Sequence, residues 1–117
     1  MTDREMLEFS AKAAGIGTLV WGDRYKLGDD EIDCTDIPYI RSGQPDESDV
    51  FWNPITDDGD ALRLAVKLRM SLDTALGQSL AIPLGGKDCV EQHADDPYAA
   101  TRRAIVRAAA EIGRQMP

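Results

Sequence analysis

Residues that build metal sites, disulfide frameworks and catalytic centres are scarce in this sequence. Its 117 residues include one histidine and two cysteines, and 6% of them are aromatic. Two cysteines allow at most one disulfide, and one histidine leaves a single imidazole for acid–base chemistry. No apolar run approaches the roughly 20 residues that span a bilayer, and the charged residues 1–8 lack the apolar segment of a secretory signal. We therefore expect reduced thiols and no membrane partner.

Large apolar side chains are few as well. Hydrophobic residues make up 43% of the chain, but 14 of them are alanine and only 25 are leucine, isoleucine, valine or phenylalanine. This share of about one fifth lies near the level below which disorder becomes common. A length of 117 residues is typical of one domain. We expect a single domain over residues 1–117 with a small, alanine-rich core.

Basic residues are outnumbered, and the acidic excess is concentrated in one segment. Thirteen Lys and Arg residues against 21 Asp and Glu residues give a net charge of −8. Residues 28–49 hold eight acids and one base, Arg41, which accounts for −7 of that charge. The acids are Asp29, Asp30, Glu31, Asp33, Asp36, Asp46, Glu47 and Asp49. Such a segment disfavours direct binding to nucleic acid and favours a basic partner. Because Pro38, Gly43 and Pro45 interrupt any regular pattern, we predict an acidic loop over about 28–49.

The N-terminal segment carries complete signals for a helix. Thr2 and Glu5 have the spacing of a capping box, in which a hydroxyl and a carboxylate bind backbone N–H groups reciprocally. Apolar residues follow at helical spacing, and Gly15 can end the helix in the left-handed conformation. We predict a helix over residues 3–14.

Two further helices are predicted from their caps and apolar stripes. Thr56 or Asp57 caps the second, and Asp96 caps the third, which has a proline in its first turn, where a missing N–H group costs nothing. On the third helix, the expected core positions are Tyr98, Thr101, Ile105, Ala108, Ile112 and Met116. An ion pair is expected between Arg107 and Glu111, which are four residues apart.

Short β-prone segments lie between the predicted helices. Residues 18–21 and 25–27 flank Gly22-Asp23 and are predicted to pair as a hairpin. Residues 37–40 are a candidate edge strand. The other strand candidates are residues 50–52, 72–76 and 79–84. Hairpins between helices, without a regular alternation of strand and helix, favour an α+β fold with a mostly antiparallel sheet.

The residues with the most chemical potential lie close together near position 90. Cys89, Glu91, His93 and Asp95 offer sulfur, imidazole and carboxylate ligands of the kind that bind zinc. A four-ligand site, however, would need Cys34 from the acidic segment. Dinucleotide, phosphate-loop and calcium-loop patterns each fail at required positions. We therefore favour a small buried thiol beside a polar turn, and we assign no catalytic residue, no cofactor site and no metal site.

Three blocks of the sequence resemble the phage ABA sandwich domain family, which comprises uncharacterised proteins of bacteriophages and prophages. The blocks are residues 6–15, 52–68 and 96–105, in the family's order. The resemblance implies an α-β-α sandwich, with three helices packed over both faces of an antiparallel sheet of about four to five strands. It also implies the cytoplasm of a bacterial host, and it implies no activity.

The leading hypothesis is a non-enzymatic phage or prophage accessory protein that acts by binding a host or phage protein, with homodimer formation left open. One alternative is an acidic protein that imitates nucleic acid and inhibits a basic host protein. Another is a small enzyme or metalloprotein centred on Cys89 and His93. The absence of a complete catalytic or cofactor motif motivates the first hypothesis, and the acidic segment motivates the second.

Overall fold

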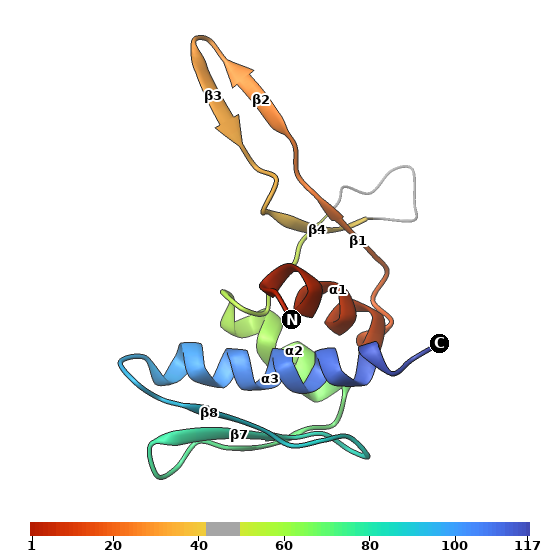
Figure 1. The fold of residues 1–117 in the computed structure, drawn as a ribbon, viewed down its shortest axis with the longest axis vertical. Coiled ribbons are helices and arrows are strands. Elements are labelled where there is room, and N and C mark those ends of the chain that lie inside the picture. Colours follow the sequence, from red (N-terminus) through yellow and green to blue (C-terminus); the bar gives the residue numbers. More distant parts are fainter. Residues whose placement is uncertain (42–49) are drawn as a thin grey trace.

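The computed structural model describes residues 1–41 and 50–117, and its core is built around helix α3 (Pro97–Arg114). Helices α1 (Asp3–Ala14) and α2 (Asp58–Lys67) pack on α3, and a small sheet covers the side of α3 opposite α1 (Figure 1). Because α3 is covered from several sides, alanine is its main core residue. Its most deeply buried positions are Ala104, Val106, Ala108, Ala109 and Ala110.

Helices α1 and α3 approach each other so closely that only small side chains fit between them. A Cβ atom added at Gly113 would lie 1.9 Å from the carbonyl oxygen of Phe9. Ser10 is fully buried in the same interface, where its hydroxyl donates a 3.1 Å hydrogen bond to the carbonyl oxygen of Val106. This bond satisfies the only polar group of the serine side chain, so its burial carries no unpaired-donor penalty.

The predicted helix starts are confirmed. Thr2 and Glu5 form both hydrogen bonds of the capping box. Asp57 caps α2 by accepting from the backbone N–H of Asp60. Asp96 caps α3 by accepting from the backbone N–H groups of Tyr98 and Ala99. The helix α1 covers the predicted residues, and Gly15 ends it in the left-handed conformation with φ 63°.

The strands form three small antiparallel sheets rather than one. The sheet that packs on α3 has the strand order β6-β7-β8. Above α1, the order is β1-β4-β5, and β2 and β3 form a separate two-stranded sheet. The strand bounds are β1 Thr18–Trp21, β2 Arg24–Leu27, β3 Asp30–Asp33, β4 Pro38–Arg41, β5 Val50–Phe51, β6 Ser71–Asp73, β7 Gln78–Ile82 and β8 Cys89–Gln92.

The chain is therefore a single-domain α+β protein, as predicted, but the expected sandwich is not confirmed. All three helices lie on one side of the sheet β6-β7-β8 (Figure 1). On the other face of this sheet, Ile82 and Val90 are exposed by 37% and 41%. No helix in the described part of the chain has both the length and the apolar character needed to cross a bilayer.

The predicted hairpin of residues 18–21 with 25–27 is wrong. Strand β1 pairs with β4, with Trp21 opposite Pro38, and strand β2 pairs with β3, with Arg24 opposite Asp33. Gly22-Asp23 carries the chain forward from one ladder to the next, and the tight turn lies instead at Gly28-Asp29. Glycine at the first turn position, with φ 66°, suits a two-residue hairpin turn.

The acidic loop predicted over about 28–49 also needs correction. Within residues 28–41 the chain forms β3, which pairs with β2, and β4, which pairs with β1. The candidate edge strand at 37–40 is the central strand β4 of its sheet. The remaining part of that prediction, residues 42–49, lies outside the described residues.

Side-chain predictions on α3 fail for more than one reason, and β8 is one of them. We predicted a buried thiol at Cys89 beside a polar turn, whereas residues 89–92 form a strand that packs on α3. Arg107 therefore pairs with Glu91 on β8 (2.9 Å) instead of Glu111, and Glu111 pairs with Arg114. Tyr98, which was expected in the core, is 70% exposed because the first turn of α3 extends beyond α1.

The close contact between α1 and α3 makes a stability prediction. We expect Gly113→Ala to lower the free energy of unfolding by about 3 kcal/mol, since the new methyl group overlaps backbone atoms of Phe9 that cannot rotate away. Urea unfolding followed by circular dichroism measures this change.

Gly59→Ala is the matched control for that measurement. Gly59 is also helical, but a Cβ atom there would meet only the flexible side chains of Arg63 and Asp57, at 3.1–3.2 Å. Its stability should stay within about 1 kcal/mol of the parent, because alanine also favours the helix. Equal effects of the two substitutions would contradict the close packing of α1 on α3.

Candidate functional site

The β2–β3 hairpin projects away from the helices (Figure 1). We call residues 24–33 the arm. All four residues of β2 and three of the four residues of β3 are exposed. The two strands pack mainly on each other, so the arm adds little to the core.

The root of the arm is held firmly although the arm itself is exposed. The Gly22 N–H donates to the Ile37 carbonyl (3.0 Å), and the Cys34 N–H donates to the Asp23 carbonyl (3.1 Å). A Cβ atom at Gly22 would lie 2.3 Å from the carbonyl oxygen of Cys34, so only glycine allows this approach. The root also continues into β1, where the Trp21 indole N–H donates to Glu8 of α1 (3.1 Å).

One face of the arm carries paired charges. Directly opposed residues of an antiparallel pair lie on the same face, which places Arg24 with Asp33 and Lys26 with Glu31. Arg24 Nε lies 3.4 Å from Asp33 Oδ2. The hydroxyl and the backbone N–H of Thr35 both donate to Asp33 Oδ1, and these bonds hold the pKa of that carboxyl below its ordinary value. The charged face is thus largely neutralised within the arm.

The opposite face of the arm carries three apolar side chains, of which Tyr25 and Leu27 are exposed and Ile32 is half-buried, and one carboxylate. It consists of Tyr25 opposite Ile32 and Leu27 opposite Asp30. Tyr25 is 51% exposed and Leu27 is 67% exposed. A two-stranded hairpin is only marginally stable by itself. Uncovered apolar side chains on a projecting, firmly rooted hairpin are typical of a surface that binds another molecule.

The acidic residues are distributed unevenly over the arm. Glu31 and Asp33 face basic residues, whereas Asp29 and Asp30 lie at the turn, where no basic residue of the described chain pairs with them. The unbalanced negative charge therefore gathers at the tip, next to Leu27. The arm presents an apolar face that ends in two carboxylates.

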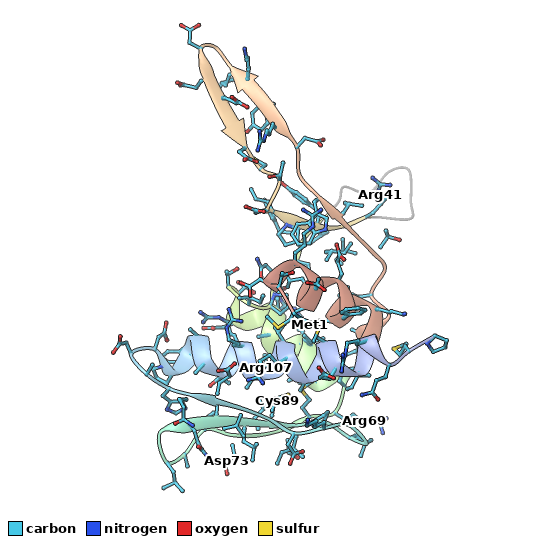
Figure 2. The ribbon with its side chains drawn as sticks, viewed as in Figure 1. Met1, Arg41, Arg69, Asp73, Cys89 and Arg107 are labelled. Atoms are coloured by element: carbon cyan, nitrogen blue, oxygen red, sulfur yellow. The ribbon has the colours of Figure 1, made fainter. Side chains whose placement is uncertain are left out.

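The residues proposed as zinc ligands are not brought together. Cys89 is buried on β8 beneath α3, and burial raises the pKa of its thiol above the ordinary value (Figure 2). Glu91 is bound to Arg107, whose guanidinium also donates to the Val90 carbonyl (3.1 Å). Within residues 1–41 and 50–117, no group of three His, Cys, Asp or Glu side chains is placed to hold a metal ion.

His93 takes part in a chain of hydrogen bonds that no local sequence pattern indicates. Its Nε2 lies 2.9 Å from the hydroxyl oxygen of Ser79, which lies 2.6 Å from the hydroxyl oxygen of Thr101. Thr101 donates its only proton to the Pro97 carbonyl (2.8 Å). Ser79 must therefore donate to Thr101, and His93 must donate its Nε2 proton to Ser79.

The direction of this chain bears on catalysis. A histidine that donates to serine does not accept the serine proton, so it does not activate that serine as a nucleophile. Ser79 is also 1% exposed and out of reach of a substrate. Cys34 lies at the root of the arm and Cys89 in a different sheet, and both thiols are free. The His93–Ser79 pair and the two cysteines thus lie in separate parts of the structure.

No known family model matches the chain, and neither a curated protein nor a solved structure matches it.

The surroundings of the two thiols predict different reactivities. We expect iodoacetamide to modify Cys34 at least tenfold faster than Cys89 in the folded protein near pH 8, since the thiolate is the reactive form and burial disfavours it at Cys89. Mass spectrometry of timed digests gives the two rates. In 6 M guanidinium chloride the rates should converge, and a Cys89 that reacts as fast as Cys34 before unfolding would contradict its burial.

Proposed function

We propose that this protein is a non-enzymatic binding protein and that the arm is the part that docks on another protein. The observation that carries the proposal is the pair of exposed apolar side chains, Tyr25 and Leu27, on a hairpin whose root is rigid. A preformed, firmly anchored element loses little conformational freedom on binding, which favours affinity.

The composition of the arm indicates the chemistry of the partner. Tyr25 and Leu27 would fit an apolar cleft on the partner. The carboxylates of Asp29 and Asp30 would pair with basic side chains at one end of that cleft. Tyrosine is among the residues that contribute most binding energy at protein interfaces. Both strands of the arm also have an unpaired edge, so strand addition by the partner is a compatible mode.

We further propose that the protein is a phage or prophage accessory protein that acts in the cytoplasm of a bacterial host. The support is the resemblance of residues 6–15, 52–68 and 96–105 to the phage ABA sandwich family. In this reading, the partner is a host or phage protein.

The second candidate is an acidic protein that imitates nucleic acid and inhibits a basic host protein, which we call the decoy. The two carboxylates at the tip of the arm favour it. A nucleic-acid mimic displays a dense row of unpaired negative charges. Arg24 and Lys26 oppose two of the four acids of the arm, which reduces that charge. The apolar contact is therefore the stronger reading, and the two readings differ in their salt dependence.

Affinity capture from a bacterial lysate tests the arm directly. We expect the double substitution Tyr25→Ser and Leu27→Ser to abolish capture of the partner, because each truncation at the centre of an interface costs about 2 kcal/mol or more. Val66→Ser is the matched control: Val66 is 69% exposed, on α2 in the body, and its substitution should leave capture unchanged.

Neutralising the carboxylates at the tip and raising the salt concentration distinguish apolar docking of the arm from the acidic decoy. Replacing Asp29 and Asp30 by asparagine, or raising the salt concentration from 0.1 to 0.5 M, should weaken capture less than threefold if the apolar contact dominates. Loss of capture in both conditions, with capture retained by the Tyr25 and Leu27 variant, would establish the decoy instead. Equal capture by all variants would contradict a role for the arm.

A further inference from the structure

A groove of about 460 Å³ opens between α2, β6 and the N-terminal half of α3. Buried Ala61 and Ile105 line its inner part. Leu62, Leu72 and Tyr98 line it near the surface, where they are exposed by 58%, 39% and 70%. A mostly apolar concavity of this volume is in the range of small-molecule sites.

The charged groups of the groove neutralise each other. The Arg102 guanidinium donates from Nε to the Ile55 carbonyl (2.7 Å) and from one terminal nitrogen to Asp58 Oδ1 (2.6 Å). The Arg102 side chain is 17% exposed and that of Asp58 is 69% exposed, so only the arginine end of this ion pair is shielded from water. Because both charges are already paired, a charged ligand would find no free counter-ion in these two residues.

His93 lines the groove together with two other uncharged polar residues, Thr74 and Thr101. Its Nε2–H is directed to buried Ser79, which leaves Nδ1 of the neutral ring as an acceptor. No hydrogen bond to Nδ1 is made within the described residues. Ser79 and Thr101 therefore hold the imidazole in one tautomer, with its accepting nitrogen uncommitted, on the wall of an apolar groove.

We infer that this groove binds a small uncharged molecule with a mainly apolar body and one hydroxyl or N–H group, which donates a hydrogen bond to Nδ1 of His93. The apolar lining selects the body of the ligand, the paired Arg102 and Asp58 disfavour a net charge, and the fixed tautomer selects a donor over an acceptor. The inference is independent of the arm and does not require that the arm bind a protein.

The probe for this site is 2-naphthol, which is neutral at pH 7 and carries one hydroxyl donor on an apolar ring system. Its matched control is 2-methoxynaphthalene, which has the same ring system but no donor. We expect saturable changes in the amide NMR signals of Ala61, Thr101 and Ile105 with 2-naphthol, and at least tenfold weaker binding of the methoxy compound. The ¹⁵N signals of His93 should show the Nε2–H tautomer, and the Nδ1 signal should shift only with 2-naphthol.

Two variants on α2 provide the protein control. Leu62→Glu places a charge in the groove, whereas Val66→Glu places the same charge one turn farther along α2, outside it. Both residues are exposed, so both variants should fold. We expect at least a tenfold loss of 2-naphthol affinity for Leu62→Glu and less than a twofold change for Val66→Glu.

Several results would overturn the inference. These are no saturable binding of 2-naphthol, equal binding of the two compounds, equal effects of the two variants, or an Nδ1–H tautomer of His93. Changes confined to signals of Ile40 and Leu64, which line a different concavity, would also place the probe elsewhere and overturn it.

Discussion

The rest of the structure depends on the burial of α3, and above all on its close contact with α1. Gly113 and Ser10 allow the two helices to touch through their backbones. Close approach brings the many alanines of α3 within reach of α1, α2 and the sheet below, so that short side chains suffice to fill the space. A chain with few large apolar residues can in this way still form a core.

This arrangement explains why the fold can be stable although the arm is exposed. Core formation involves the three helices and the sheet β6-β7-β8, and it leaves β2 and β3 outside. The arm is nevertheless held at its root by Gly22, which permits the backbone of Cys34 to approach, and by Trp21, which is bonded to α1. The molecule therefore combines a compact body with a directed projection.

Local signals predicted the helices well and the strand pairing badly, for a physical reason. Caps such as Thr2 with Glu5, or Asp96 before a proline, act within four residues and can be identified from the sequence. Gly22-Asp23 and Gly28-Asp29 look equivalent as turns, and the choice between them is made by the pairing of β1 with the distant β4.

The candidate sites were equally beyond local reasoning. The apolar face of the arm exists only in the observed register of β2 and β3, since pairing of β1 with β2 would have given Tyr25 and Leu27 different neighbours. The chain from His93 through Ser79 to Thr101 joins β7 to the segment after β8 and to α3, over separations of 14 and 22 residues. What the sequence did indicate was a buried Cys89, whose exposure is 6%.

The central claim is that the arm serves binding and contributes little to folding. The most direct measurement is the free energy of unfolding of a variant in which residues 24–33 are replaced by two glycines that join Asp23 to Cys34, whose backbones are already hydrogen-bonded. The account predicts cooperative urea unfolding with a free energy within about 1 kcal/mol of the parent, the usual range for changes at the surface. A loss of about 3 kcal/mol or more, or a transition that is no longer cooperative, would show that the arm is part of the folding unit and would contradict the account.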